Sequence, residues 1–306
     1  MVRVRICVVS WNACADLRAC LASLPGAVAD PSTLETVVVD NGSVDGSPEM
    51  VEAEFPDVRL IRLDANLGFS GGNNVALEGL AADHAFLLNS DAVCEPGAID
   101  RLLAYADAHP EAGMLGPKVL NPDGSLQYSC RRWPTPSAGL FRNVWVGRFF
   151  PGNRPAADYL MRDFDHASVR DVDWLSGCAL FVSRACIERI GPMDGETFFF
   201  YCEDMDWCLR AHEAGLEVRY VPDAVVVHKI GGSSDRIADR MIIEHSRSMV
   251  RFWRKHAKFF QGRVPSWAGA LVVPWAVMRA AVRIARRHLQ PESARRAWRE
   301  KREVRR

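Results

Sequence analysis

The sequence lacks three features that would each place it in a specialised class of proteins. No stretch of its 306 residues approaches the roughly 18 uninterrupted apolar residues of a membrane-spanning helix, which argues against a polytopic membrane protein. Its nine cysteines form no C-x-x-C pair and are odd in number, so we expect buried thiols in a reducing compartment, not a zinc ribbon or a disulfide scaffold. Internal repeats are also missing. What remains is an ordinary globular composition, with 48% hydrophobic and 25% charged residues.

The chain also has no net charge at pH 7, but only because the opposite charges of two unlike regions sum to zero. Residues 1–235 hold 19 basic and 33 acidic side chains, a net charge of −14, whereas residues 236–306 hold 19 basic and 5 acidic ones, a net charge of +14. A basic tail on an acidic body predicts that the tail meets an anionic surface, with membrane headgroups and nucleic acid as the candidates. A solvated helical face is the alternative without a partner.

The first 120 residues alternate apolar, β-branched runs with amphipathic segments, which is typical of parallel strands joined by helices. We predict strands at 3–9, 34–39, 58–63, 84–88 and 113–119. We predict helices at 14–24, 46–54, 71–82 and 97–108. The apolar run at the N-terminus is short and soon followed by polar residues, so it indicates a first strand and not a signal peptide.

The second part of the body is less regular. It begins with an Asn-Pro-Asp-Gly turn at 121–124 and continues with a segment rich in proline, arginine and aromatic residues at 133–170. A strand is predicted at 172–182, a helix at 205–214, and a strand and loop at 216–228. We therefore expect a body at 1–235, with halves of about 1–120 and 121–235, and a tail at 236–306.

The tail is predicted to be helical and amphipathic. Its segment 264–285 places arginines beside the apolar residues Trp267, Leu271, Val272, Val273, Trp275 and Met278. This pattern is typical of an interfacial anchor. The apolar stretch is short and contains Pro274, so a helix lying in the headgroup plane fits it better than one crossing the bilayer. Packing on the body or against a second copy is the alternative.

Polar side chains follow the first two predicted strands. Ser10 and Asn12 come after the first, and Asp40 and Asn41 come at the end of the second. Open α/β sheets bind ligands beyond the carboxyl ends of their strands, which would allow Asp40 to accept a hydrogen bond from a nucleobase or ribose. Capping a helix is the alternative role for Asp40.

A glycine-rich loop follows the third predicted strand and reads Asn66-Leu67-Gly68-Phe69-Ser70-Gly71-Gly72-Asn73-Asn74. Its glycines let the backbone approach a ligand closely before a helix begins. The nicotinamide-binding fingerprint G-x-G-x-x-G should follow the first strand, where Ser10-Trp11-Asn12 stands instead. The sequence therefore argues against a nicotinamide-dependent dehydrogenase.

Asn89 and Asp91 end the fourth predicted strand, and alternation puts their side chains on the same side of an extended chain. Their oxygens suit Mg²⁺ or Mn²⁺, which usually retain waters and substrate phosphates in their shell. One protein carboxylate and a diphosphate would therefore suffice to hold the ion. The same residues also fit an ordinary turn.

Two further groups with possible chemistry lie in the second half of the body. Glu203, Asp204 and Asp206 stand between aromatic residues, and apolar walls raise the pKa of an acid toward that of a general base. The alternatives are a favourable interaction with a helix dipole and an i,i+4 pair between Asp206 and Arg210. His228 ends an apolar run and precedes a Gly/Ser-rich loop, which favours a metal or phosphate role over a structural one.

Taken in order, these motifs resemble glycosyltransferase family 2, the inverting nucleotide-sugar enzymes with a GT-A fold, and especially rhamnosyltransferase-like bacterial members. The resemblance covers about residues 3–235. The matching pieces are Val9-Ser10-Trp11-Asn12, Val39-Asp40-Asn41-Gly42-Ser43, Asn66-Leu67-Gly68-Phe69 with Gly72-Asn73-Asn74, Leu88-Asn89-Ser90-Asp91, Trp174-Leu175-Ser176-Gly177, Glu203-Asp204-Met205-Asp206-Trp207 and His228. The resemblance implies a mostly parallel central sheet flanked by helices, with a C-terminal helical extension.

The resemblance also implies roles for these residues. Asp204, next to Glu203, would be the catalytic base, and Asp91 and His228 would hold a divalent cation, Mg²⁺ or Mn²⁺. The donor side would comprise Ser10, Asn12, Asp40, Asn41, Asn66, Gly68, Asn73, Asn89 and Asp91. The acceptor side would comprise Trp174, Gly177 and Asp206. The family's metal motif is commonly Asp-x-Asp, and Asn89 in the first place leaves one charge fewer.

The activity implied is transfer of a sugar, first of all L-rhamnose from dTDP-rhamnose, to a hydroxyl of a lipid-linked glycan in cell-surface polysaccharide synthesis. The tail would bind the inner face of the plasma membrane from the cytoplasm, and nucleic acid is not expected as a partner. The oligomeric state stays open, a homo-oligomer included. The alternatives are a nucleotide-sugar-binding subunit without turnover and a nucleotidyltransferase, whose basic triphosphate loop is not seen after the first strand.

Overall fold

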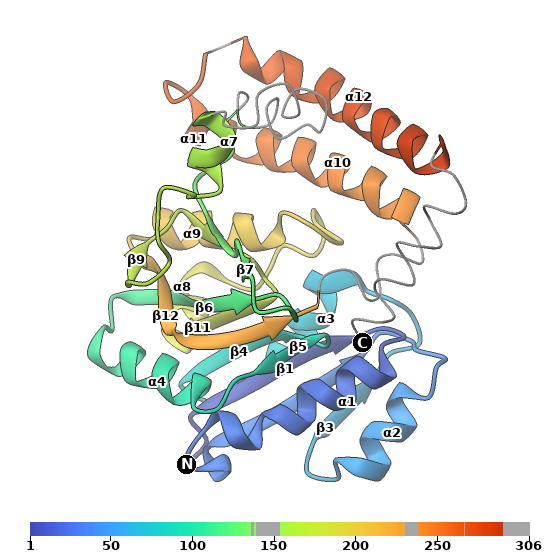
Figure 1. Cartoon of the computed structure of the whole chain (residues 1–306), viewed down its shortest axis with the longest axis vertical. Coiled ribbons are helices and arrows are strands. Elements are labelled where there is room, and N and C mark those ends of the chain that lie inside the picture. Colours follow the sequence, from blue (N-terminus) through green and yellow to red (C-terminus); the bar gives the residue numbers. More distant parts are fainter. Residues whose placement is uncertain (136–137, 139–153, 230–237, 266, 290–306) are drawn as a thin grey trace. The chain divides into compact units, whose positions relative to one another are not determined.

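The structure of the protein is a computed structural model that describes residues 1–135, 138, 154–229, 238–265 and 267–289 (Figure 1). The chain divides into two compact units, Met1–Ser233 and Ser234–Arg306. The first is an α/β structure and the second is helical. Parts of the predicted irregular segment, at 136–137 and 139–153, lie outside the described residues, as do 290–306 at the end of the tail.

A ten-stranded sheet forms the centre of the first unit, with the strand order β3-β2-β1-β4-β11-β6-β12-β5; β7 pairs with β6, and β9 with β12. Its strands are β1 (Val4–Ser10), β2 (Leu34–Asp40), β3 (Arg59–Arg62), β4 (His84–Asn89), β5 (Ala92–Cys94), β6 (Ala112–Leu120), β7 (Leu126–Gln127), β9 (Arg170–Asp171), β11 (Ala179–Ser183) and β12 (Glu217–His228). β8 (Cys130–Arg131) and β10 (Trp174–Leu175) form a separate antiparallel pair.

The sheet is mostly parallel, as predicted. β11 is antiparallel to both of its neighbours, β4 and β6, so β1, β2, β3, β4, β6 and β12 all run in one direction. Their carboxyl ends therefore meet at one edge. Ser10, Asp40, Asn89 and His228 are the last residues of four of these strands, so the predicted site residues converge there.

Helices cover both faces of the sheet (Figure 1). They are α1 (Cys14–Ser23), α2 (Ser47–Glu54), α3 (Gly68–Leu77), α4 (Ala98–Ala108), α8 (Arg184–Ile190) and α9 (Glu203–Glu213), with short 3-10 turns at Pro25–Ala27 and Pro31–Thr33. A further short helix of this unit, α7 (Arg154–Tyr159), is not part of this covering layer (Figure 1). Alternate residues of β1 face opposite ways: Ile6 and Val8 join the main apolar core with Leu17 of α1 and Leu102 of α4, whereas the Cys7 thiol faces Ala76 of α3. Strands buried on both faces explain the continuous apolar runs of the sequence.

The structure differs from the predicted elements in one broken strand, in the bounds of two helices and in four short strands. The predicted strand at 172–182 is broken into β10 and β11 by residues 176–178, and β11 enters the sheet between β4 and β6. The helix predicted at 71–82 begins and ends earlier, at Gly68 and Leu77, and the helix predicted at 205–214 begins at Glu203. The short strands β5, β7, β8 and β9 were missed because two or three residues carry no detectable alternation.

The second unit is a helical hairpin. It comprises α10 (Ala238–Lys255), α11 (Ala257–Phe260) and α12 (Ala268–Leu289), so the prediction of a helical tail is confirmed. Arg287 and His288, at the end of α12, pair with Asp239 at the start of α10 at 3.0 and 2.8 Å, which makes the two long helices antiparallel. Within the described residues, no helix is both long enough and apolar enough to cross a bilayer.

The start of α3 is locked to the segment that precedes α9, and a glycine makes this contact possible. Gly68 has a φ of +78°, and a Cβ atom placed on it would lie only 2.1 Å from the carbonyl oxygen of Phe199. The N–H of the next residue, Phe69, donates to that same oxygen at 2.9 Å, and the Ser70 hydroxyl donates to the carbonyl of Phe198 at 2.7 Å. The close approach that the structure shows at this glycine is to Phe199, and the predicted approach to a ligand stays a prediction.

We predict that Gly68→Ala destabilises the protein more than Gly79→Ala does. Gly79 also has a positive φ, +61°, but a Cβ there would meet nothing within 4 Å. Both variants should lose about 1–2 kcal/mol of unfolding free energy from the left-handed backbone. Gly68→Ala should lose on the order of 1–3 kcal/mol more from the clash. Urea unfolding of the two variants checks this, and equal losses would contradict the packing described.

Candidate active site

The register between β12 and β5 brings together the two residues predicted to hold a cation. Asp91 lies in the turn between β4 and β5, and His228 pairs with Ala92, the first residue of β5. His228 Nε2 consequently lies 3.1 Å from Asp91 Oδ1, and the two side chains are only 10% and 14% exposed. Strand pairing thus places an imidazole nitrogen beside a carboxylate at the carboxyl edge of the sheet.

Two amides flank the His228 ring. Asn89 Nδ2 lies 3.2 Å from His228 Nε2, so the side chains of Asn89 and Asp91 do lie on the same side, at one nitrogen of the ring. Gln127 Oε1 lies 2.7 Å from the other ring nitrogen, Nδ1. Sequence reasoning missed Gln127, because a glutamine in a two-residue strand after a turn has no recognisable pattern.

The donor atoms at this edge fit a hard divalent cation whose coordination is completed by a ligand. Asp91 offers carboxylate oxygen and His228 offers imidazole nitrogen. Among the described residues, no group of three or more His, Cys, Asp or Glu side chains is arranged to hold a metal ion. Two protein donors would leave the remaining positions to diphosphate oxygens and water, which is how Mg²⁺ and its relatives commonly bind beside phosphates.

Ser10 and Asp40, neighbours in the β1–β2 register, present unsatisfied polar atoms. Asp40 is 2% exposed; its Oδ2 accepts from the N–H of Ser43 at 2.8 Å, whereas its Oδ1 has no hydrogen-bond partner. The Ser10 hydroxyl is fully buried and also unpartnered. Buried polar groups are nearly always paired in proteins, so these two atoms point to a ligand at the ends of β1 and β2.

The loops after β1 and β2 are tied to each other around this position. Asn12 has a left-handed backbone, with a φ of +52°, and its N–H donates to the Ser43 hydroxyl at 2.8 Å. Its side-chain oxygen accepts from the N–H of Val44 at 2.9 Å. Asn12 thus holds together two loops that border Asp40, at the cost of a backbone conformation that non-glycine residues seldom adopt.

Three asparagines, two from the glycine-rich loop and one directly after β2, bond to the backbone of this loop. Asn66 Oδ1 accepts from the N–H of Gly68 at 2.8 Å, Asn41 Nδ2 donates to the carbonyl of Gly68 at 3.0 Å, and Asn73 Nδ2 donates to the carbonyl of Phe69 at 2.9 Å. These bonds shape the start of α3. The donor-binding roles predicted for these residues stay predictions.

The chain enters α9 through strained backbone. Tyr201 and Cys202 both have positive φ angles, +71° and +69°, directly before Glu203 and Asp204. Non-glycine residues in this region cost on the order of 1–3 kcal/mol each, and such residues cluster at functional sites. The strain turns the two acids into the protein instead of leaving them on a solvated helix start.

Asp204 is held by two backbone N–H groups. Its Oδ2 accepts from the N–H of Gly177 at 2.9 Å, and its Oδ1 accepts from the N–H of Met205 at 2.8 Å. Burial raises the pKa of the Asp204 carboxyl above its usual range, and the two N–H groups oppose that rise because they favour the carboxylate. Both effects suit a general base, which must be ionised and yet basic.

Glu203 is buried more completely than its neighbour. It is 5% exposed, and its Oε2 has no hydrogen-bond partner. Burial raises the pKa of the Glu203 carboxyl well above its usual range, and the adjacent charge of Asp204 raises it further. Of the two acids, Glu203 is the one that burial and the adjacent charge most favour in the neutral form.

A two-residue turn joins Asp204 to the end of β4, the strand that precedes Asp91. The N–H of Gly177 donates to Asp204, and the carbonyl of the next residue, Cys178, accepts from the N–H of Asn89 at 3.0 Å. A Cβ on Gly177 would lie 3.1 Å from the Phe69 ring and 3.5 Å from Cβ of Asp204. The turn therefore brings the predicted base and the end of β4 to the same place.

Trp174 and Asp206, predicted for the acceptor side together with Gly177, are well covered by protein. Trp174 is 6% exposed, donates to the carbonyl of Arg132 at 3.0 Å, and lies under the guanidinium of Arg131. Asp206 is fully buried and pairs with Arg210 at 3.0 Å, which is the i,i+4 pair that the sequence left open. An acceptor role for these two residues stays a prediction.

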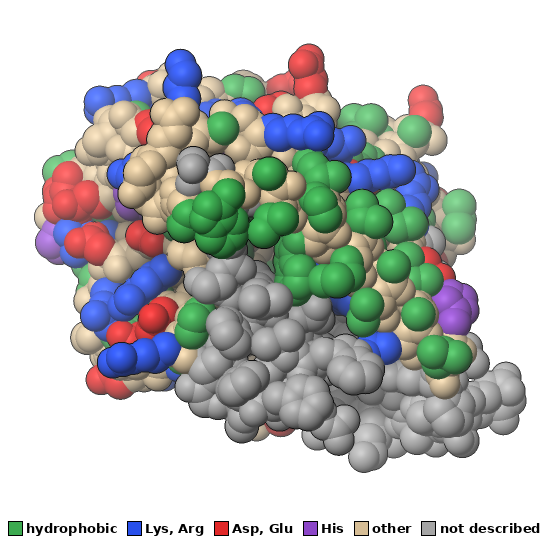
Figure 2. Space-filling model, turned by 90° about the horizontal axis from the view of Figure 1, so that it is seen from above, with side chains coloured by type: hydrophobic (Ala, Val, Ile, Leu, Met, Phe, Trp, Pro, Cys, Tyr) green, Lys and Arg blue, Asp and Glu red, His purple; other side chains and the backbone are tan. Residues whose placement is uncertain are grey.

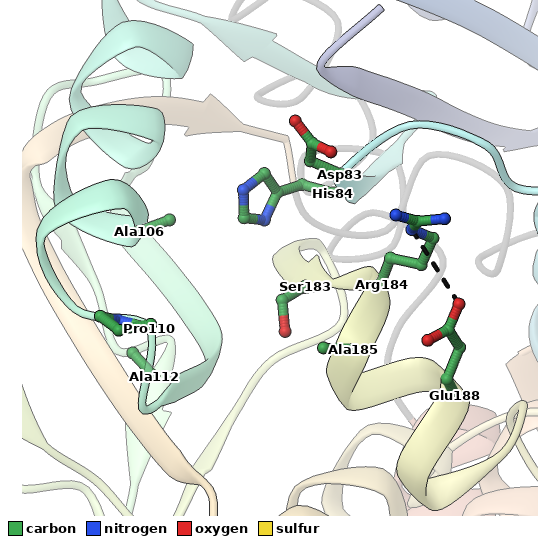
Figure 3. A pocket seen from close by; sticks show the side chains of 9 residues that line it. All are labelled: Asp83, His84, Ala106, Pro110, Ala112, Ser183, Arg184, Ala185 and Glu188. Carbon is green, nitrogen blue, oxygen red and sulfur yellow. Dashed lines mark ion pairs between the residues drawn. The ribbon is translucent and has the colours of Figure 1, made fainter.

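A further pocket lies at the opposite, amino-terminal edge of β4 (Figure 3). Asp83 and His84 border it on one side, and Ser183, Arg184 and Glu188 border it at the junction of β11 and α8. Burial lowers the pKa of His84, whose ring stacks on Phe181 at 4.8 Å. Because it lies at the other end of β4 from Asn89, this pocket is separate from the residues predicted to bind the donor.

Comparison with protein families and known sequences identifies clear relatives. A family model described as glycosyl transferase family 2 matches residues 5–166. The chain is 35% identical over 243 residues to the N-acetylglucosaminyl-diphospho-decaprenol L-rhamnosyltransferase of Mycobacterium tuberculosis, covering 76% of this chain and 78% of the relative. It is 26% identical over 230 residues to the dTDP-rhamnosyl transferase RfbF of Shigella flexneri, covering 73% of this chain and 69% of the relative.

Solved structures share the fold. The mannosyltransferase PcManGT of Pyrobaculum calidifontis, in complex with GDP-Man and Mn²⁺, superposes with a TM-score of 0.58 at 18% identity over 99% of this chain and 80% of that one. GalNAc-T7 with UDP, GalNAc and Mn²⁺ gives a TM-score of 0.56 at 13% identity over 75% of this chain and 44% of that one. These structures confirm the predicted GT-A fold.

The buried acid pair predicts a pH dependence of stability. The raised pKa of Glu203 means that the native protein binds more protons than the unfolded chain between the ordinary glutamate pKa, about 4.3, and the folded value. Stability is therefore lost as the pH rises through this window, by up to about 1.4 kcal/mol per pH unit. Glu203→Gln removes the titrating group, so its melting temperature relative to the wild type should rise with pH.

Glu213→Gln is the matched control, because Glu213 ends the same helix on the surface. Thermal melts of the three proteins from about pH 4 to pH 8 provide the measurement. A difference between Glu203→Gln and the wild type that is the same at every pH would show that Glu203 does not titrate with a raised pKa.

Proposed function

The chain belongs to glycosyltransferase family 2 and is a glycosyltransferase, and from this membership we propose that it transfers L-rhamnose from dTDP-rhamnose to a hydroxyl of a lipid-linked saccharide. The proposed reaction inverts the configuration of the anomeric carbon and uses a divalent cation. The observation that carries the proposal is the turn at Gly177 and Cys178. It brings Asp204, a held and basic carboxylate, to the end of β4, and β4 leads to Asp91, the neighbour of His228.

The donor is assigned from the relatives and from the ends of β1 and β2. Two relatives are named for transferring rhamnose, one of them from a dTDP-linked donor. In this chain, the unpartnered oxygen of Asp40 and the unpartnered hydroxyl of Ser10 would bind the base or ribose of the nucleotide. Asn12 and Asn41 would keep the surrounding loops in place through their backbone contacts.

The chemistry assigned to this chain is a single displacement. Asp204 removes the proton of the acceptor hydroxyl, whose oxygen forms a bond to the anomeric carbon while the bond from that carbon to the diphosphate breaks. Attack from the face opposite the leaving group inverts the configuration. A neutral Glu203, which its raised pKa favours, would keep the charge of the acid pair on Asp204, and the N–H of Gly177 fixes the direction of the Asp204 carboxylate.

Asp91 and His228 would hold the cation on the donor diphosphate. A divalent ion supplies positive charge where negative charge grows on the departing diphosphate. The side chains of this pair converge on one point, 3.1 Å apart, and leave most of a coordination shell to phosphate oxygens and water.

The acceptor and the location are assigned from the relatives and the tail. The relative from M. tuberculosis is named for an acceptor linked to decaprenyl diphosphate, and such a lipid keeps its substrate group at a membrane surface. We assign the second unit to that surface, at the cytoplasmic face of the plasma membrane. A binding subunit without turnover is the alternative, and it fits poorly with the positioned and basic Asp204.

The second unit presents a surface suited to this task. Hydrophobic and basic side chains lie side by side on the face that carries α12 (Figure 2). Exposed apolar side chains on and beside α12 are Trp267 (62% exposed), Leu271 (53%), Val273 (40%), Val277 (64%), Met278 (47%) and Leu289 (81%). Tryptophan and arginine beside aliphatic residues favour the interface of an anionic bilayer.

We predict that Asp204→Asn lowers kcat by about 10²–10⁴-fold while the binding of dTDP is retained, because only proton removal is lost. Rhamnose transfer from dTDP-rhamnose to a polyprenyl-diphosphate-linked N-acetylglucosamine is measured for both proteins, with dTDP affinity measured by calorimetry. UDP-glucose and GDP-mannose serve as competing donors. If the wild type binds dTDP-rhamnose but transfers no sugar to any acceptor offered, the binding-subunit alternative takes the place of the proposal.

For the tail, we predict that replacing Trp267, Leu271 and Val277 by serine weakens binding to phosphatidylglycerol-containing vesicles by about ten-fold or more, because buried apolar area is lost. Val169→Ser removes an exposed valine from the first unit and should leave binding unchanged. Co-sedimentation at low and high salt measures both the apolar and the electrostatic contributions. Binding that survives the triple substitution would remove the assignment of α12 to the membrane.

A further inference from the structure

The two nitrogens of the His228 ring meet partners of different kinds. Nδ1 lies 2.7 Å from Gln127 Oε1, and Nε2 lies 3.1 Å from Asp91 Oδ1 and 3.2 Å from Asn89 Nδ2. A neutral imidazole carries its proton on only one of these nitrogens, and the other holds a lone pair. The tautomer therefore decides whether Nε2 is able to bind a cation.

The orientation of the Gln127 amide settles which atom faces Nδ1. Gln127 Nε2 donates to the backbone carbonyl of His228 at 3.1 Å and to Asn121 Oδ1 at 2.9 Å. A carbonyl only accepts, so the amide nitrogen must be the atom on that side, and the amide oxygen must be the one against Nδ1. Nδ1 consequently carries the proton of the neutral ring and donates a hydrogen bond to Gln127 Oε1.

The Asn-Pro-Asp-Gly turn continues this chain of hydrogen bonds away from the site. The Ser125 hydroxyl donates to Asp123, so its oxygen is free to accept from Asn121 Nδ2 at 2.9 Å. Asn121 is thereby oriented with its oxygen toward Gln127. The Gln127 amide nitrogen uses its two hydrogens on two acceptors, and the direction of the last bond in the series is fixed by the carboxylate of Asp123, which only accepts.

Backbone pairing holds the turn in place. The N–H of Asn121 donates to the carbonyl of Ser125 at 2.8 Å, and Gly124 supplies the left-handed residue, with a φ of +79°. Gln127 pairs with Val119 near the end of β6, the same end along which the last residues of β12 pair. The turn thus brings a side-chain amide to His228 from a rigid strand.

The consequence at Nε2 is an arrangement that calls for a cation. An unprotonated Nε2 and the Asp91 carboxylate are both electron-pair donors, and they face each other at 3.1 Å. Asn89 Nδ2, 3.2 Å from Nε2, offers this lone pair one hydrogen bond, and a positive ion bound by both Nε2 and Asp91 would remove the repulsion between them. A metal-binding histidine commonly donates its other N–H to a fixed acceptor, which sets the tautomer and the direction of the ring.

We propose that Gln127 is a positioning residue, which the turn at residues 121–125 orients so that it holds the proton of His228 on Nδ1 and leaves Nε2 open to the cation. The inference rests on the proposed cation role of Asp91 and His228. It adds a residue that touches neither substrate nor ion and that acts through the tautomer of the ring.

The test is ¹⁵N NMR of histidine-labelled full-length protein without metal, at about pH 8.5, where imidazoles are generally neutral. The resonances of His228 are assigned by their loss in His228→Asn. In the wild type, Nδ1 should show the shift of a protonated nitrogen and Nε2 that of an unprotonated one. Gln127→Met removes the acceptor and should mix the two tautomers, whereas Gln127→Glu keeps an acceptor against Nδ1 and should preserve the wild-type pattern.

Mn²⁺ affinity in the presence of dTDP, measured by electron paramagnetic resonance, is the second readout. Gln127→Met should weaken it by about ten-fold, toward the range known for lost partners of metal ligands. Gln261→Met, the same substitution at an exposed position of the second unit, should leave it unchanged. A His228 that carries its proton on Nε2 in the wild type, or an unchanged tautomer and affinity in Gln127→Met, would overturn the inference.

The two proposals fail in different ways. If the wild type binds no Mn²⁺ with dTDP, or if Asp91→Ala binds it as well as the wild type, the cation role of the pair fails. The NMR result on the metal-free protein would then still decide whether Gln127 sets the tautomer.

Discussion

The hydrogen bond from the N–H of Gly177 to the Asp204 carboxylate is the constraint on which the rest of the site depends. Residue 178, next in the chain, bonds to the end of β4, so a single turn fixes the position of the proposed base relative to the strand that leads to Asp91. The turn stands there because β11 enters the sheet antiparallel beside β4, with Ala179 opposite Leu88. The order of the strands, and not a local sequence motif, therefore brings the proposed base close to the strand end that carries residues predicted to bind the donor.

The same turn governs the electrostatics of the acid pair. Two backbone N–H groups favour ionised Asp204, whereas Glu203, whose Oε2 has no partner, has its pKa raised by burial and by its neighbour. The environment of Glu203 thus favours its neutral form, whereas the hydrogen bonds to Asp204 favour its carboxylate. The protein accepts a cost for this separation in the left-handed backbone at Tyr201 and Cys202 and in a buried acid that is more stable without charge. The features that suit Asp204 to the proposed role of base therefore lower the free energy of unfolding of the protein.

Much of this could be predicted from the sequence, because parallel strands bring their carboxyl ends together. Polar residues at strand ends, Asp40 and Asp91 among them, were placed at one edge by apolar periodicity and by the resemblance to the family. The insertion of β11 could not be predicted, since a buried antiparallel strand and a buried parallel one have the same apolar pattern. Gln127 was beyond prediction for another reason: its role comes from a turn and from pairing with β6, and both are tertiary.

Asn89 affects how the proposed pair of cation ligands, Asp91 and His228, would bind an ion. Where an aspartate would add charge to a cation site, Asn89 points its amide nitrogen at the same His228 nitrogen that faces Asp91. Its N–H donates to the Nε2 lone pair, so a cation must displace this hydrogen bond before it reaches the ring. With one carboxylate and a competing amide, the two proposed ligands would bind an ion weakly by themselves. The diphosphate of the proposed donor would then supply the missing negative charge, and retention of the cation would depend on the presence of the nucleotide sugar.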